Sequence, residues 1–270
     1  MVFAIVAVVG PGRIVPAQPA HPASSVPIGT PAPRIVVAAD RTVRMTNLGG
    51  PQQDTLLSRV AAIIGQAVDA VEAFWGTDWP REIAVVATGS QQQFETEAGG
   101  GPPAQWADIA AVAVADRVDP ARRIAIGQRI VFAPGAVGMS ASALRIVLSH
   151  ELFHYAARAD TALDAPRWLT EGVADYVARP ATPLPESMPL PTALPSDADL
   201  AAPGLQRSQA YDRAWWFARF VADTRGVATL RALYRAACGV GHTDVSTALH
   251  DVLGADMAAV LADWQQWLTR

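Results

Sequence analysis

The sequence contains no lysine, since all 21 basic residues are arginine. It contains a single cysteine, Cys238, which excludes an intrachain disulfide and a metal site built from several thiolates. Charged residues make up 17% of the chain, fewer than the roughly 25% of an average globular protein. Because 51% of the residues are hydrophobic, the composition excludes a protein that is disordered over most of its length.

The formal net charge of −4 argues against a basic surface, so no nucleic-acid partner is expected. A chain of 270 residues can form one large domain or two small ones, and either can bury a substantial core. No internal repeat is evident. We expect a monomer.

The first 33 residues differ from the rest of the chain. Val2–Val9 is an uninterrupted apolar run, followed by a segment rich in proline and alanine. The run is far shorter than the ~20 residues of a bilayer span, but it matches the hydrophobic region of a signal peptide. Basic residues, which normally precede such a region, are absent, so a simple apolar tail is the alternative. We interpret residues 1–33 as the remnant of a signal or membrane anchor with a linker, which predicts an exported protein, secreted or associated with the cell envelope.

The remainder, residues 34–270, is expected to form one α+β domain, rich in strands over 34–139 and helical over 140–270. In the first part, strands are predicted at 35–39, 41–45, 82–87, 110–115, 123–126 and 129–133, with helices at 52–75 and 90–97. In the second part, helices are predicted at 140–158, 167–179, 207–224, 227–237, 244–252 and 256–268. The segment 180–203 contains seven prolines and is expected to be a loop without regular structure.

The motif with the clearest chemical meaning is His150-Glu151-Leu152-Phe153-His154. On a helix, residues i and i+4 lie one turn apart on the same face, so both imidazoles can bind one metal ion. Glu151 is rotated out of this row, where it can act as a general base on a water molecule. The helix is apolar around these residues, and burying them without a partner is costly. The alternative is a pair of core histidines with Glu151 in an ion pair.

A second pair of acids follows on the next predicted helix. Glu171 lies 17 residues after His154, and Asp175 follows one helical turn later. Glu171 is the candidate third zinc ligand. Asp175 is expected to accept a hydrogen bond from a ligand histidine, as carboxylates around metal sites commonly do. The alternative, two solvated acids on a helix surface, loses weight beside the histidine motif.

Together these two segments resemble the gluzincin metallopeptidases, and most of all the small peptidases of the peptidase MA-like type. The resemblance covers about residues 83–270 and includes Trp168–Tyr176, Tyr211–Phe217 and Asp263–Leu268. It implies a thermolysin-like core, a small sheet whose edge strand lines a cleft above the active-site helix. It also implies that His150, His154 and Glu171 bind Zn²⁺ and that Glu151 is the general base.

Two departures from the aminopeptidase N-type members bear on the kind of peptidase. The spacing between His154 and Glu171 is shorter than in those enzymes, and the segment 132–139 lacks the acid that holds a substrate's amino terminus. We therefore expect an endopeptidase that acts on peptide or protein substrates. The strand at 129–133 is the candidate edge for pairing with the substrate.

The donor that stabilises the oxyanion is expected to be Tyr211, which follows the proline-rich segment near the start of a helix. Packing of its ring against Trp215 is the alternative interpretation. Two other functions stay open: a protein with a catalytically silent zinc site that binds peptides or envelope components, and a zinc hydrolase acting on a non-peptide bond. His242 and His250 are interpreted as surface or capping residues, and Trp215, Trp216 and Phe217 as core.

Overall fold

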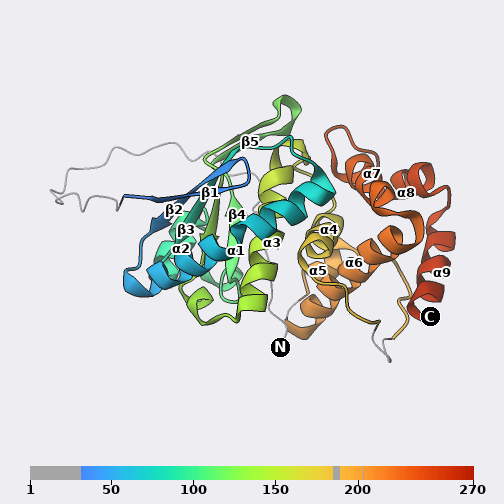
Figure 1. Cartoon of the computed structure of the whole chain (residues 1–270). Helices are drawn as coiled ribbons and strands as arrows, with labels where there is room; N and C mark the ends of the chain where they lie inside the picture. Colours follow the sequence, from blue (N-terminus) through green and yellow to red (C-terminus); the bar gives the residue numbers. More distant parts are fainter. Residues whose placement is uncertain (1–31, 185–188, 203) are drawn as a thin grey trace.

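The structure, a computed structural model, describes residues 32–184, 189–202 and 204–270. The predicted signal or anchor segment therefore lies outside the described residues, apart from its last two positions. The fold is α+β, with a five-stranded mixed sheet in the N-terminal part and helices in the C-terminal part (Figure 1).

The sheet has the strand order β1-β2-β3-β7-β4. Strands β1 and β2 pair antiparallel, β2, β3 and β7 are parallel, and β4 runs antiparallel to β7. Short runs of valine, isoleucine and alanine form the central strands and are almost completely buried, as expected for a sheet covered on both faces. The strands are β1 (Arg34–Ala38), β2 (Arg41–Asn47), β3 (Glu82–Ala87), β4 (Ala111–Val114) and β7 (Arg129–Phe132).

The prediction that residues 129–133 form the edge of the sheet is wrong. Strand β7 lies between β3 and β4, so its backbone groups are already paired on both sides. The edge next to the histidine helix is β4. A separate hairpin of β5 (Arg117–Asp119) and β6 (Ile124–Ile126) follows β4, and β5 was not predicted.

Two helices pack on the sheet and on each other: α1 (Pro51–Trp75) and α3 (Ala141–Ala157). Helix α1 presents an apolar stripe from Leu56 to Phe74, and α3 contacts β4 and β7. The short α2 (Gln91–Glu97) packs against β7. Helix α3 is thereby held directly beside the edge strand, and this arrangement places the histidine motif.

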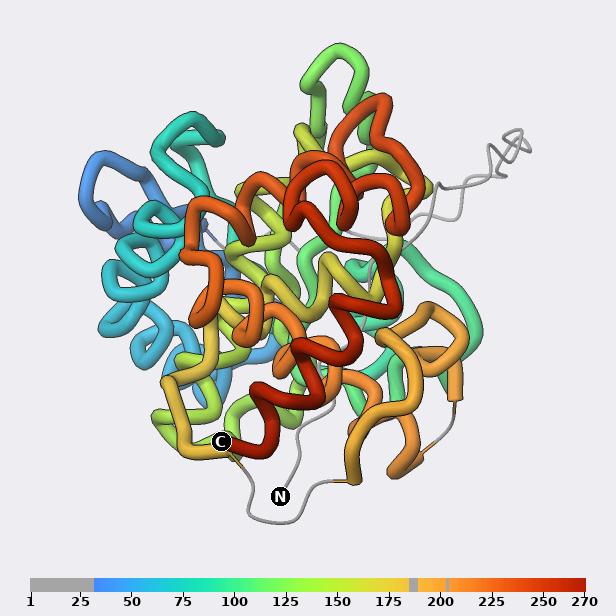
Figure 2. Tube along the Cα trace, turned by 90° about the vertical axis from the view of Figure 1, so that its right-hand side faces the viewer, coloured from blue at the N-terminus to red at the C-terminus, as the bar shows by residue number. Residues whose placement is uncertain are grey.

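The C-terminal part is a layer of helices that lies beside α3 and faces the viewer in Figure 2. Helix α4 packs between α3 and α6, and one hydrophobic cluster extends from Ala38 on the sheet to Trp267 in the last helix. The helices are α4 (Arg167–Ala178), α5 (Asp197–Leu200), α6 (Gly204–Arg225), α7 (Val227–Cys238), α8 (Val245–Leu253) and α9 (Met257–Leu268).

The prediction that the proline-rich segment 180–203 has no regular structure is wrong for its last part. Its last part contains the four-residue helix α5, whose first turn is stabilised by a capping box. The side chain of Ser196 accepts a hydrogen bond from the backbone N–H of Asp199, and Asp199 accepts one from the backbone of Ser196. This local signal outweighs the high proline content, because no proline falls within the turn itself.

Within the described residues, no single helix has both the length and the hydropathy of a bilayer span. Helices α8 and α9 meet that requirement only when taken together, across a bend of 68°.

Candidate metal centre

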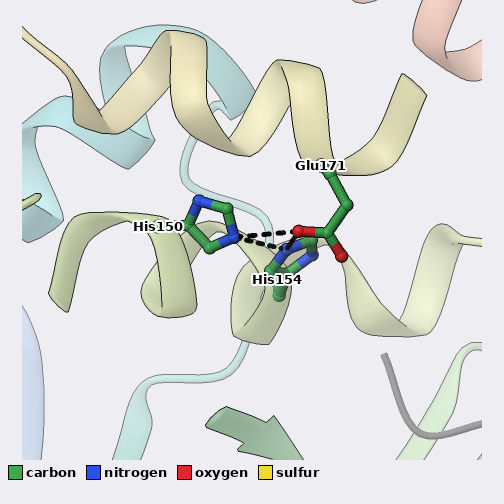
Figure 3. Close-up of side chains that lie close together, drawn as sticks. All are labelled: His150, His154 and Glu171. Carbon is green, nitrogen blue, oxygen red and sulfur yellow. Dashed lines mark hydrogen bonds and ion pairs between the residues drawn. The ribbon is translucent and has the colours of Figure 1, made fainter. Parts of the chain in front are cut away.

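Helix α3 carries both histidines on one face. Ser140 caps its first turn by accepting a hydrogen bond from the backbone N–H of Ala143. From Val147 to Ala157 every residue is buried, so the imidazoles of His150 and His154 lie inside the protein. The centroids of their rings are 4.8 Å apart, and the two rings converge on Glu171 (Figure 3).

Helix α4 brings Glu171 toward the two imidazoles from the opposite side (Figure 3). The side chain is almost fully buried. The neighbouring Gly172 allows α6 to approach closely, because a Cβ atom at this position would lie only 2.5 Å from the carbonyl oxygen of Ala214. Glycine here thus sets how α4 packs between α3 and α6.

The three ligand atoms form a compact triangle. The Nε2 atoms of His150 and His154 are 3.1 Å apart, and Glu171 Oε2 lies 3.2 Å and 3.6 Å from them, respectively. Tetrahedral zinc with metal–ligand distances of ~2.0–2.2 Å requires ligand atoms about 3.4 Å from one another. The spacing of the three residues therefore fits a metal ion. Among the described residues, this is the one group of His, Cys, Asp or Glu side chains whose ligand atoms lie close enough to hold a metal ion. The structure supports a metal-binding cluster without identifying the metal.

His150 and Glu171 form an ion pair within the cluster. Burial lowers the pKa of His150, but hydrogen bonds to Asp175 and Glu171 outweigh it and raise the pKa to about 10. Burial raises the pKa of Glu171, but the facing imidazoles outweigh this effect and hold its pKa far below the usual range. The carboxylate is thus ionised and directed at two imidazole nitrogens.

Asp175 lies behind His150, as predicted. Its Oδ1 accepts a hydrogen bond from His150 Nδ1 at 2.9 Å, which leaves Nε2 facing Glu171 and His154. Its Oδ2 is 2.6 Å from Arg179 Nη2, and Arg179 also pairs with Asp212 on α6 at 2.7 Å. A chain of three ionic contacts therefore links the His150 ring to helices α4 and α6.

Glu151 lies beside the cluster and contacts the sheet. Its Oε2 accepts a hydrogen bond of 2.7 Å from the backbone N–H of Ala113 on β4, whereas the buried Oε1 has no partner among the described residues. Burial raises the pKa of Glu151 to about 7, and the charge of His150 and the Ala113 N–H oppose this shift. One oxygen of the Glu151 carboxylate is therefore fixed by the sheet, and the other has no partner among the described residues.

Tyr211 is buried, and its hydroxyl accepts a hydrogen bond of 2.9 Å from Arg167 Nη2. The Nε atom of Arg167 is in turn 3.9 Å from Glu171 Oε1, so Tyr211 is connected to the cluster through one residue. We had expected Tyr211 to start a helix, but α6 begins at Gly204 and Tyr211 lies two turns inside it. From the body of α6, its hydroxyl contacts Arg167. Trp215 lies against Trp216, with centroids 4.3 Å apart and ring planes tilted by 36°.

The other candidates lie elsewhere. His242 pairs with Asp164, and the exposed His250 lies beside Asp251. Asp160, on the connection between α3 and α4, pairs with Arg123. The expectation that Trp215, Trp216 and Phe217 belong to the core is confirmed.

Sequence reasoning missed three residues around the cluster. Arg158 follows His154 by four residues and Arg179 follows Asp175 by four, so helical spacing was a usable signal for both. The contact of Glu151 with the Ala113 N–H could not be predicted, because every residue except proline has a backbone N–H and the strand is distant in the sequence.

Comparisons with known proteins do not extend this description. No family model matches the chain, and no curated protein matches its sequence.

Proposed function

We propose that the protein is a zinc-dependent metallopeptidase of the gluzincin type with a thermolysin-like core. One observation carries the proposal: two imidazoles and a carboxylate at tetrahedral spacing lie beside a buried glutamate with one free oxygen. A site that only stored a metal would not require this glutamate. Zinc is the metal that best fits two nitrogen ligands and one oxygen ligand in this geometry.

His150, His154 and Glu171 would hold the ion. When bound, zinc supplies Lewis-acid chemistry, which makes water a nucleophile near neutral pH and polarises the scissile carbonyl. Glu151 Oε1 accepts the proton of the attacking water and transfers it to the nitrogen of the departing amine. The Ala113 N–H keeps the Glu151 carboxylate in one orientation through both transfers.

The Tyr211 hydroxyl donates a hydrogen bond to the carbonyl oxygen as this atom gains negative charge. The hydroxyl proton is available for this role because Arg167 already supplies the hydrogen bond that the Tyr211 oxygen accepts. Burial and the charge of Glu171 raise the pKa of Tyr211 well above its usual range, so the group stays a donor at any physiological pH.

The proposed substrates are peptides or unfolded proteins, cleaved internally. We propose that the protein acts as a monomer outside the cytoplasm, as its N-terminal composition predicts. An extended peptide would lie near β4, the edge strand beside α3, and not near β7. The N–H and carbonyl of Ala113 on that edge are already bonded to Glu151 and Arg158, so the peptide would not pair with β4 at this residue.

Hydrolysis of casein by the zinc-loaded full-length chain tests the proposal. The wild-type protein should contain one zinc per chain and cleave casein, and Glu151→Gln should retain the zinc and lose activity by ~10²–10⁴-fold. Glu97→Gln is a suitable control, because Glu97 lies on α2 away from the cluster. A Glu151→Gln protein with more than about a tenth of wild-type activity would contradict the general-base role.

A further inference from the structure

Of the two histidines, the one nearer the end of α3 is the more exposed. His150 is 1% exposed and His154 is 8% exposed, and one turn further Arg158 is partly exposed. Arg158 continues the row of the two histidines, since each follows the previous one by four residues. A molecule that reaches the cluster from this end passes the guanidinium of Arg158.

The guanidinium of Arg158 makes fewer hydrogen bonds than its donors allow. Among the described residues it makes one hydrogen bond, from Nη2 to the carbonyl oxygen of Ala113 at 2.5 Å, and its buried Nε has no partner. No carboxylate of the described residues lies within ion-pair distance of it. By contrast, Arg123 and Arg179, which flank the same region, each contact two carboxylates.

Burying a cationic group without a counter-ion is unfavourable, and burial accordingly lowers the pKa of Arg158. The charge of Glu151 offsets part of this cost, but the two side chains do not touch. They contact the same residue of β4, Glu151 at the N–H of Ala113 and Arg158 at its carbonyl. The guanidinium donors of Arg158 that have no partner are therefore separated from the proposed base, Glu151, only by the backbone of Ala113.

The planar fork of an arginine matches a carboxylate and binds it through two parallel hydrogen bonds. We propose that Arg158 selects substrates that present a carboxylate next to the bond to be cleaved. The inference rests on the proposed peptidase function and specifies its substrate class. An aspartate or glutamate side chain supplies the carboxylate if cleavage is internal, as proposed above. The C-terminus of a peptide supplies it if the enzyme instead removes terminal residues.

A set of three alanine-rich peptides tests this assignment and separates the two sources. One contains a single glutamate and has an amidated C-terminus. The second contains glutamine at that position, also with an amidated C-terminus, and the third contains glutamine with a free C-terminal carboxylate. The kcat/KM for each is measured by mass spectrometry with the zinc-loaded full-length wild type, Arg158→Gln and Arg158→Lys. Binding of the same peptides is measured by calorimetry on zinc-loaded Glu151→Gln, with and without Arg158→Gln.

Arg122→Gln is the matched control, because Arg122 is 77% exposed and already paired with Asp119. We expect wild type to prefer one of the carboxylate peptides by about 10–100-fold over the peptide without a carboxylate. Arg158→Gln should remove this preference in both kcat/KM and binding, with little effect on the uncharged peptide. Arg158→Lys should restore it only in part.

An equal loss for all three peptides would overturn the proposal, because it would make Arg158 a positioning residue for Glu151. Absence of any preference in wild type would overturn it as well. If Arg158→Gln does not fold, as judged by its thermal transition, Arg158→Lys alone has to weaken the preference. Failure of wild type to cleave casein or any peptide contradicts the peptidase function instead, and the calorimetric comparison still decides the role of Arg158.

Discussion

Asp175 fixes the orientation of His150 without belonging to the ligand triangle. The imidazole can rotate about the bond that joins the ring to Cβ. Only one orientation directs Nε2 at His154 and Glu171. The hydrogen bond from Nδ1 to Asp175 selects that orientation. In the neutral imidazole that a metal ion would bind, it also keeps the proton on Nδ1 and the lone pair on Nε2. Arg179 holds the second oxygen of Asp175, so the carboxylate itself cannot turn away.

Asp175→Asn should therefore weaken zinc binding by ~10–100-fold while the protein remains folded. The measurement is a competition titration with a chromophoric chelator. Asp223→Asn is the control, because Asp223 pairs with Arg219 and does not belong to the contacts behind His150. If Asp175→Asn stays within about twofold of wild type, Asp175 does not orient the ligand.

Tyr211→Phe keeps the ring and removes only the hydroxyl. Loss of an oxyanion donor should reduce kcat by ~10²–10³-fold with little change in KM. The lost hydrogen bond from Arg167 should also lower stability by about 1 kcal/mol. Tyr155→Phe serves as the comparison, since the Tyr155 hydroxyl donates to the Glu82 carbonyl on β3 and should affect stability alone. A Tyr211→Phe enzyme with a kcat within about threefold of wild type would leave Tyr211 a packing residue.

At this scale the sequence was most informative where residues act within one helix. The relation of His150 to His154, and of Glu171 to Asp175, follows from the pitch of a helix, and the predicted cluster and the hydrogen bond to His150 are confirmed. The roles of Glu151 and Tyr211 remain predictions.

Among the elements, α4 depends on a residue that is remote in sequence. Its N-cap residue is Pro166, whose side chain cannot accept a hydrogen bond. Asp197, at the start of α5, replaces it: its two oxygens accept hydrogen bonds from the backbone N–H groups of Arg167 and Trp168, at 3.1 Å and 2.7 Å. The carboxylate also places a negative charge at the positive end of the helix that carries Glu171.

Removal of this cap tests its contribution. Asp197→Ala should lower the free energy of unfolding of the zinc-loaded protein by about 1 kcal/mol, the usual effect of losing an N-cap, as measured by urea denaturation. Asp197→Asn retains an acceptor oxygen and should lose only a few tenths of a kcal/mol, the charge contribution at a helix terminus. Equal stability of Asp197→Ala and wild type would show that α4 holds its position without the cap.

Local patterns predicted the helices well because their apolar periodicity is a property of neighbouring residues. The strand order is different, since β7 pairs with β3 and β4 over distances that no local pattern records, and this is why the edge strand was misassigned. The capping box at Ser196 was a local signal, but it was overlooked among the prolines. The cap of α4 by Asp197 had no such signal.

In the whole molecule, the metal cluster lies where the sheet and the helical part meet. Glu151 contacts β4, the ligands come from α3 and α4, and the ionic contacts behind them extend to α6. A bound ion would connect α3 and α4 directly, and both of these helices also belong to the common hydrophobic cluster. We therefore expect metal binding to stabilise the entire fold.

Removal of zinc by a chelator should lower the Tm, and addition of zinc should restore it. Free zinc at about 100 times its Kd contributes about 2.7 kcal/mol to the stability of the native state. Glu171→Ala should abolish the response to zinc, whereas Asp164→Ala should retain it, because Asp164 is exposed and pairs with His242. A zinc response of Glu171→Ala equal to that of wild type would exclude Glu171 as a ligand.

The remote cap of α4 also determines when the metal centre can form as the chain is made. His150, His154 and Glu171 leave the ribosome before Asp197, which caps α4, and before Asp212, which holds Arg179. Until those residues follow, the ligands are present on a chain that has not yet acquired the groups that orient them. A nascent chain would therefore bind metal weakly. It would acquire a competent centre only after the residues up to Asp212 have been added. In a proposed peptidase, this order delays the active site until the protein is nearly complete.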